Sequence, residues 1–273
     1  MNYEIRRRED DKYAVFDVNG KMISPDWFDW IREDGLVKGG SPYYIAVKDG
    51  KKAIFDKYGN QITEWFDGIW LDGLVRGESE YYIASKHGRW AIFHKDGSQI
   101  SGWFYAISSV GLVSGKSEYY IVESYGKVAI FHKDGRQISE WFGWIGADGL
   151  LSGKSEYYLV RDKGKEAIFD VNGNMITPDW FNEILPYGLV KGECDYYITC
   201  SDIYRCAVYH KNGQKVSDDF TRDYVKYADR ITFNEKVGIV EIEKYNGTIK
   251  SIEFFPVIHK KEEIIDYTKL LNI

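Results

Sequence analysis

Pairs of adjacent tyrosines recur through this 273-residue chain at a spacing of 38 or 39 residues. Each pair is followed at a regular distance by an alanine, an aromatic residue and a glycine, and a Trp-Phe pair recurs at 27, 65, 103, 141 and 180 before the tryptophan is lost at Asp219-Phe220. A period held at so many positions is typical of a tandem array of one supersecondary unit, in which each unit packs mainly on its neighbours. The pairs are Tyr43-Tyr44, Tyr81-Tyr82, Tyr119-Tyr120, Tyr157-Tyr158 and Tyr196-Tyr197.

The residue pattern within each repeat predicts antiparallel strands. Short runs rich in tyrosine, valine, isoleucine and phenylalanine alternate with glycine-containing turns, and helical spacing is absent. One turn carries Tyr58 directly before its glycine, where a positive φ is unfavourable for tyrosine. We therefore expect a type I turn followed by a left-handed glycine, rather than a two-residue type I′ turn. A further strand is expected through residues 149–153, which gives three or four strands per repeat.

The double tyrosine predicts a strand that is buried on both faces. Successive strand residues point to opposite sides, so Tyr119 and Ile121 line one side while Tyr120 and Val122 line the other. Such a strand must lie between two packed layers, and neighbouring repeats supply these layers. We interpret the tyrosines as packing residues whose hydroxyls reach the layer edge for a hydrogen bond.

The ends of the array set the predicted organisation. Residues 1–233 read as six tandem β-repeat units, 234–258 as a degenerate seventh unit and 259–273 as a short C-terminal capping helix. An all-β open twisted solenoid of hairpin units, each of about 38 residues, needs such caps, whereas a closed ring does not. The alternative is a six- or seven-bladed β-propeller, whose blades usually take about 40–45 residues.

Charge and composition argue against several classes of protein, namely nucleic-acid-binding, membrane and zinc-binding proteins. A net charge of −6 and a pI near 5.5 leave no basic face for direct nucleic-acid binding. The first residues are charged rather than apolar and no run is long enough to span a membrane, so we expect no membrane association and a cytoplasmic location. Cys194, Cys200 and Cys206 are expected to be reduced, and their spacing of six matches no common zinc motif.

No motif for catalysis is present. The chain contains no phosphate loop, no H-E-x-x-H and no nucleophile set beside a base, so we predict no catalytic residues, no cofactor and no metal. One column of acidic and imidazole side chains lies at the first position of a tight turn, where such side chains bond the turn backbone. We interpret it as structural rather than as a metal or proton-transfer ladder. It comprises Asp17, Asp56, His94, His132, Asp170 and His210.

Residues that vary between repeats are the candidates for binding. Aromatic residues near the Trp-Phe pairs would anchor a partner if exposed, and would fill gaps between units if buried. These are Trp30, Trp70, Tyr105 and Trp144. Acidic residues recur before the tyrosine pairs and either keep the surface soluble or form a negative stripe that meets a basic groove. These are Glu80, Glu118, Glu156 and Asp195.

Segments 87–104 (HGRWAIFHKDGSQISGWF) and 125–142 (YGKVAIFHKDGRQISEWF) resemble the bacterial WG-repeat, or KWG-repeat, proteins. The resemblance covers about residues 3–220, with a weaker trace to 258. The name-giving Trp-Gly is replaced by Trp90-Ala91 once and by other residues before alanine elsewhere. The resemblance implies a repetitive β scaffold from a bacterium or phage, with no shared enzymatic activity and no catalytic residues to transfer.

These observations predict a non-enzymatic repeat scaffold that binds another protein. A narrower hypothesis is an inhibitor or immunity-type protein that blocks a nucleic-acid-handling enzyme or toxin, with an acidic, aromatic face meeting the partner's basic surface. The alternative is a glycan or small-ligand binding protein with an aromatic pocket in each repeat. A third hypothesis, a metal-dependent hydrolase built on the Asp/His column, would require bound metal.

Overall fold

The computed structural model describes residues 3–202 and 204–256, which form an all-β array of small antiparallel sheets. β1 and β2 make a two-stranded sheet, three-stranded sheets follow, and β15–β18 form a four-stranded sheet before the last one, β19–β21. The strands are β1 (Glu4–Arg7), β2 (Tyr13–Phe16), β3 (Trp30–Ile31), β4 (Tyr43–Lys48), β5 (Lys51–Asp56), β6 (Gly68–Ile69), β7 (Tyr81–Lys86), β8 (Arg89–His94), β9 (Ala106–Ile107), β10 (Tyr119–Ser124), β11 (Lys127–His132), β12 (Trp144–Ile145), β13 (Tyr157–Asp162), β14 (Lys165–Asp170), β15 (Glu183–Leu185), β16 (Tyr196–Cys200), β17 (Arg205–His210), β18 (Phe220–Thr221), β19 (Ala228–Asn234), β20 (Ile239–Lys244) and β21 (Ile249–Glu253). A 3-10 helix, η1 (Arg222–Tyr224), links the last two sheets.

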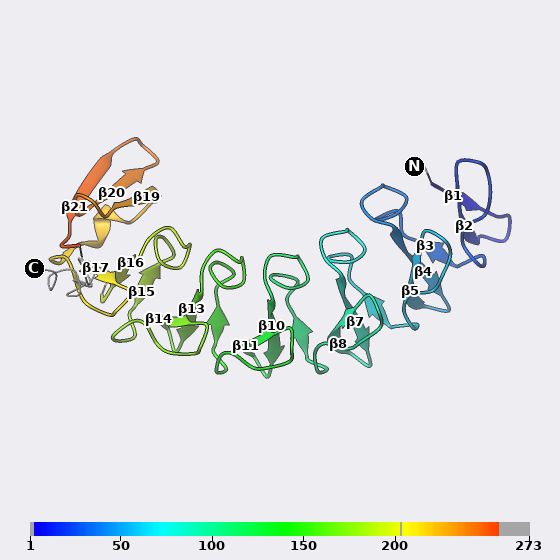
Figure 1. Ribbon diagram of the computed structural model, residues 1–273, viewed down its shortest axis with the longest axis horizontal. Helices are drawn as coiled ribbons and strands as arrows, with labels where there is room; N and C mark the ends of the chain where they lie inside the picture. Colours follow the sequence, from blue (N-terminus) through cyan, green and yellow to red (C-terminus); the bar gives the residue numbers. More distant parts are fainter. Residues whose placement is uncertain (1–2, 203, 257–273) are drawn as a thin grey trace, which may run out of the picture.

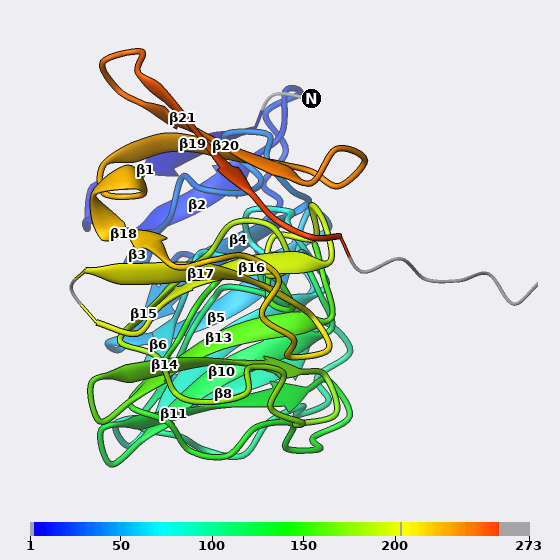
Figure 2. The same ribbon diagram turned by 90° about the vertical axis from the view of Figure 1, so that its left-hand side faces the viewer.

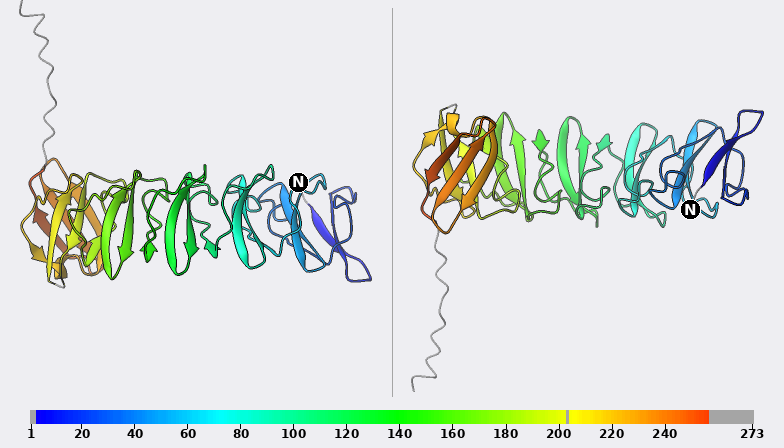
Figure 3. Two further views of the ribbon diagram at one scale, coloured as in Figure 1. Left: turned by 90° about the horizontal axis from the view of Figure 1, so that it is seen from below. Right: turned by 90° about the horizontal axis from the view of Figure 1, so that it is seen from above.

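The sheets stack into an open arc (Figure 1). The β1–β2 sheet and the β19–β21 sheet lie at its two ends, and within the described residues no strand of one pairs with a strand of the other. Seen end-on, the long strands of successive sheets run in similar directions, one behind another (Figure 2). Seen from above or below, the arc is a band whose strands cross its width (Figure 3). The predicted all-β stack of hairpin units is confirmed, and the described residues do not close into a ring.

One of the unit boundaries predicted from the sequence can be compared with the strands of the structure. β19 begins at Ala228, so the last sheet starts ahead of the 233/234 boundary. The predicted capping helix, 259–273, lies outside the described residues.

The core lies between consecutive sheets. One cluster joins Ile45 and Ile54 of the β3–β5 sheet to Phe66, Tyr82 and Phe93 of the next repeat. Because each sheet between the two terminal ones is covered on both faces by its neighbours, its apolar strands are protected from water without a layer of helices.

The second tyrosine of every pair is fully buried, and it stacks on the aromatic residue of the neighbouring strand. Tyr120 faces Phe131, for example, with ring centroids 5.8 Å apart. The packing role is therefore confirmed. The predicted hydroxyl bonds are wrong for Tyr44, Tyr158 and Tyr197, whose buried OH groups have no hydrogen-bond partner among the described residues. These three hydroxyls are buried instead of reaching the sheet edge.

Two kinds of turn alternate along the chain. Gly59 has φ +88° and Tyr58 has no positive φ, which confirms the predicted left-handed glycine turn. The two-residue hairpins β4–β5, β7–β8, β10–β11 and β13–β14 differ, because both of their central residues have positive φ, as a type I′ turn requires. One of them places a tyrosine, Tyr125, at φ +50° before Gly126.

Residues 149–153 form a turn and not the expected strand. Leu150 N donates to Tyr157 O (2.8 Å) and Gly153 N donates to Leu150 O (3.3 Å), so the chain curls back before β13. We call this segment and its equivalents the inner loops, because they lie on the concave side of the arc (Figure 1). They comprise residues 35–41, 73–79, 111–117, 149–155 and 188–194. The third strand of each sheet is instead the short pair of residues after Trp-Phe, such as Trp144–Ile145.

The inner loops stack on one another through their second glycine. A Cβ at Gly153 would lie 2.2 Å from Lys116 O in the preceding loop, and one at Gly192 would lie 2.1 Å from Lys154 O. Ser155 Oγ donates to Val190 O of the following loop (2.7 Å). Glycine at this position therefore allows the close backbone contact that sets the spacing of the repeats.

Candidate partner-binding surface

The predicted acidic and aromatic binding residues lie at opposite ends of the long strands. Glu156 precedes β13, whereas Trp144 pairs with Arg161 near the other end of that strand. Five residues of strand separate the two positions, which corresponds to about 16 Å. We call the two sides the acidic margin, with Glu80, Glu118, Glu156 and Asp195, and the aromatic margin, with Trp30, Tyr105 and Trp144. The structure does not combine the acidic and aromatic residues into one site.

Most carboxylates of the acidic margin already have a cationic neighbour. Glu118 binds Lys133 and lies 3.2 Å from His132 Nε2, and Glu80 binds Lys95 and His94 in the same way. Lys133, followed by His132, lowers the pKa of Glu118. Asp195 pairs with Lys211 at 2.9 Å. The margin is therefore a row of ion pairs at the surface, each of which contributes little to stability.

The aromatic margin carries exposed rings, and those of Tyr105 and Trp144 have a cationic neighbour. Trp30 is 50% exposed and packs edge-on against Tyr13 at 5.1 Å. Tyr105 is 65% exposed, with the Arg89 guanidinium 5.6 Å from its ring centroid. Trp144 is 43% exposed.

The Trp144 ring contacts Arg161 at 5.3 Å, and Arg161 also binds the buried carboxylate of Glu166. Glu166 Oε2 accepts from Ile184 N at 2.6 Å, so this carboxylate ties the β12–β14 sheet to the next one. An arginine held against an indole in this way presents a flat and partly ordered surface to solvent.

Trp70 belongs to the packing and not to this margin. It is partly buried in the cluster between two sheets and meets Trp90 edge-on, with ring centroids 5.6 Å apart. The Trp90 ring also occupies the space beside Gly68, where a Cβ would lie 3.1 Å from it. Of the two roles left open by the sequence, gap filling therefore applies to Trp70.

Tyr125, which the sequence pattern did not single out, is 97% exposed in the type I′ turn between β10 and β11. In the preceding repeat the equivalent turn residue, His87, donates its backbone N–H to Asp67 Oδ2 at 2.8 Å. In the β9–β11 sheet Tyr125 takes the place of His87 and Tyr105 takes the place of Asp67. Two tyrosines thus replace the aspartate and the hairpin residue whose backbone N–H it accepts in other repeats. The sequence does contain one signal: Tyr125 is an aromatic residue directly before the hairpin glycine, where two of the equivalent residues, Asp49 and Lys163, are charged.

Two surface hollows recur at equivalent positions between repeats. One, of about 470 Å³, is lined by Lys48, Asp49, Lys51 and Trp65 among others. The other, of about 450 Å³, is lined by the equivalent residues Asp162, Lys163, Lys165 and Trp180, together with Asp179. Both combine one indole wall with charged groups.

The Asp/His column has a structural role where its contacts are visible. Asp170 Oδ1 accepts from the backbone N–H groups of Asn172 (2.9 Å) and Asn174 (2.8 Å) within its own turn. Asp17 and Asp56 bind their turns in the same manner. Among the described residues, no group of three or more His, Cys, Asp or Glu side chains is placed to hold a metal ion.

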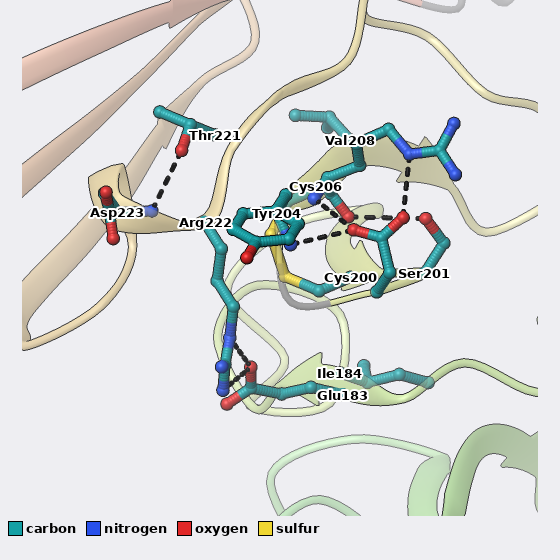
Figure 4. The surroundings of a disulfide bond; sticks show 12 residues. Glu183, Ile184, Cys200, Ser201, Tyr204, Cys206, Val208, Thr221, Arg222 and Asp223 are labelled. Atoms are coloured by element: carbon teal, nitrogen blue, oxygen red, sulfur yellow. Dashed lines mark hydrogen bonds and ion pairs between the residues drawn. A yellow bond between two sulfur atoms is a disulfide. The ribbon is translucent and has the colours of Figure 1, made fainter.

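Cys200 and Cys206 form a disulfide across the β16–β17 hairpin, so the expectation of reduced thiols is wrong for this pair (Figure 4). The strand register places the two residues directly opposite each other, which the spacing of six alone could not show. Burial raises the pKa of the remaining thiol, Cys194, to about 12. Disulfides are typical of oxidising compartments, so a cytoplasmic location stays a prediction.

The end of the array near the disulfide is held by short polar contacts (Figure 4). Asp202 accepts from the backbone N–H groups of Tyr204 and Arg205, and Arg222 binds Glu183 from the preceding β15 at 2.7 Å. The Arg222–Glu183 contact joins η1 to the β15–β18 sheet.

No family model and no curated protein matches this chain. Solved structures align at low similarity. A eukaryotic initiation factor has 10% identity and a TM-score of 0.40 over 92% of this chain and 73% of that one. Hsv2 from Kluyveromyces lactis has 9% identity and a TM-score of 0.35 over 91% and 94%, and BamB from Moraxella catarrhalis has 12% and 0.31 over 94% and 81%. At these TM-scores the alignments carry no argument about function. Among the described residues, no helix has the length and apolarity needed to cross a bilayer.

Proposed function

We propose that this protein is a non-enzymatic repeat scaffold that binds another protein through its aromatic margin. The observation that carries the proposal is the exposure of Tyr105, Tyr125 and Trp144 on consecutive sheets at one margin. Tyrosine, tryptophan and arginine concentrate binding energy in protein interfaces, and all three residue types meet here. The likeness to WG-repeat proteins is part of this proposal and agrees with a scaffold role.

A narrower form of the proposal is an inhibitor or immunity-type protein whose partner is a nucleic-acid-handling enzyme or toxin with a basic surface. The net charge of −6 and the acidic margin support it. Lys95 and Lys133 already neutralise part of that margin, so the partner's cations would have to replace them. Binding of this kind weakens steeply as salt is raised.

The test is affinity capture from the native host at low and high salt, followed by mass spectrometry. The bait is compared with a Tyr105→Ala/Trp144→Ala variant and with a Tyr58→Ala control, since Tyr58 is exposed but lies in a left-handed glycine turn away from the aromatic margin. We expect a stoichiometric partner that the double variant loses and the control retains. A partner retained by all three baits would refute the aromatic margin, and indifference to salt would refute the narrower form.

The second candidate is a glycan or small-ligand binding protein, favoured by the recurrence of the hollow at Trp65 and Trp180. Each hollow offers an indole face on which a sugar ring can stack, beside lysine and aspartate groups that can donate or accept hydrogen bonds. Calorimetric titration with oligosaccharides should then reveal several equivalent weak sites, which Trp180→Ala reduces by one. Capture of a tight protein partner with no saccharide heat would reject this candidate.

A further inference from the structure

The inner loops share one backbone conformation that places a side chain beside a glycine N–H. In the loop 73–79, Glu78 N donates to Gly73 O at 2.9 Å, and the same bond joins Lys116 to Gly111, Lys154 to Gly149 and Glu193 to Gly188. The first glycine has positive φ in each loop, between 71° and 89°. In the first inner loop, 35–41, the same bond joins Gly40 to Gly35, but Gly40 has no side chain. In the other four loops, the side chain of the residue five places after the first glycine therefore starts from the same point.

Two of these loops bind a carboxylate of their own chain. Glu78 Oε2 accepts from Gly73 N at 2.9 Å, and Glu193 Oε2 accepts from Gly188 N at 2.9 Å. A backbone N–H that donates to a carboxylate makes a charge-assisted hydrogen bond, which is stronger than one between neutral groups. The loop is thus built to receive a carboxylate at this position.

The two central loops lack this carboxylate and carry a cation in its place. Lys116 and Lys154 stand where Glu78 and Glu193 stand in the neighbouring loops, and both lysines are exposed. Among the described residues, neither Gly111 N nor Gly149 N donates to a protein acceptor, although both glycines are buried. A backbone N–H without a protein acceptor can donate to a ligand that reaches it.

We propose that the inner loops 111–117 and 149–155 form two adjacent carboxylate-binding sites for an acidic segment of a partner protein. In each site the glycine N–H donates to one Asp or Glu side chain of the segment, and Lys116 or Lys154 supplies the opposite charge. The carboxylate is chosen over other anions because the chain's own Glu78 and Glu193 show that group bound in the equivalent place.

The two sites differ in one neighbour. Position 110 is valine, whereas the equivalent Asp148 brings a negative charge to the second loop. Asp72 holds the same position before the 73–79 loop, where it binds Arg76. The 149–155 loop has Ser152 in place of that arginine, so no such cation is available to Asp148 from this position. We therefore expect the Gly111 site to bind a carboxylate more tightly than the Gly149 site.

The experiment follows backbone amide resonances of 15N-glycine-labelled full-length protein during titration with a short poly-glutamate peptide. The Gly111 and Gly149 amides should shift in a saturable manner and lose the effect at high salt. Lys116→Glu and Lys154→Glu reproduce the residue found in the neighbouring loops. The new glutamate should accept the hydrogen bond of the glycine N–H, and the cation is removed. Each substitution should weaken the binding of the peptide by roughly tenfold or more and leave the fold intact.

The reciprocal change supplies the matched control. Glu78→Lys should create a third site, so that the Gly73 amide begins to respond to the peptide. Tyr58→Ala should leave peptide binding unchanged, because Tyr58 is exposed and lies outside the inner loops. No saturable shift, or equal binding by Lys116→Glu and the wild type, would overturn the proposal. A response of the same amides to inorganic phosphate but not to the peptide would overturn the choice of a carboxylate.

Discussion

Removing the hydroxyl of Tyr158 should stabilise the protein, whereas removing its whole side chain should destabilise it. Tyr158 is 0% exposed and stacks on Phe169 with ring centroids 5.9 Å apart. Its hydroxyl has no partner among the described residues, and burial raises the pKa of the phenol above its usual value.

The expected magnitudes follow from these contacts. An unpaired buried hydroxyl costs about 1–3 kcal/mol of desolvation, so Tyr158→Phe should raise the free energy of unfolding by about 1 kcal/mol after relaxation. A fully buried aromatic ring replaced by alanine typically costs about 3–5 kcal/mol, through lost transfer free energy and a residual cavity. The two variants should therefore differ by about 4 kcal/mol or more, with opposite signs relative to the wild type.

Denaturant unfolding followed by circular dichroism measures both variants, with Tyr125→Phe as a control because that hydroxyl is in solvent. Arrays can unfold in parts, so amide exchange of β13 and β14 should be recorded alongside. A loss of more than about 1 kcal/mol in Tyr158→Phe would show that the hydroxyl has a partner and that the stacked geometry is wrong.

Other substitutions test further parts of the fold. Gly153→Ala should destabilise by several kcal/mol, because its Cβ meets backbone at 2.2 Å, whereas Gly126→Ala, with nothing within 4 Å, should cost only about 1 kcal/mol of backbone strain. Thermal unfolding of the pair checks this. Glu166→Ala should cost about 3 kcal/mol in denaturant unfolding, since it removes a buried acceptor of a backbone N–H and a guanidinium. The Ser98 hydroxyl and N–H lower the pKa of Asp96 from 3.8 to about 2. Its contribution to stability is present above pH about 4 and lost toward pH about 2, and Asp96→Asn should remove that slope from an acid titration of stability.

The repeating positions made the packing predictable. Alternation along the strands and the fixed columns placed Tyr120 and its equivalents in the core, and the occurrence of Tyr58 in one turn correctly selected the turn type. Both conclusions rest on local rules, the two-residue period of a strand and the cost of a positive φ, which hold in any tertiary context.

Other features depended on register and on loop shape. Leu150 and Leu151 read as strand because they are apolar, but they are buried by a turn that curls against Tyr157. The disulfide required the pairing of Cys200 with Cys206, which a turn of unknown length leaves open.

The separation of acidic and aromatic residues also followed from register, because the two sets occupy opposite ends of the same strands. The recurrence of a residue type at one position of the repeat does not show how the short strand aligns with the long strand beside it. Tyr125 was missed because it lies in a turn, where an aromatic residue has no packing pattern to reveal it.

The most direct test of the central claim is a calorimetric titration of the captured and purified partner against wild-type protein, the Tyr105→Ala/Trp144→Ala variant and the Tyr58→Ala control. If the aromatic margin anchors the partner, the double variant should bind roughly a hundredfold more weakly, as expected for the loss of interface anchors of about 1–2 kcal/mol each, and the control should bind like the wild type. Equal affinities for all three proteins would contradict the claim and place the partner on another face of the array.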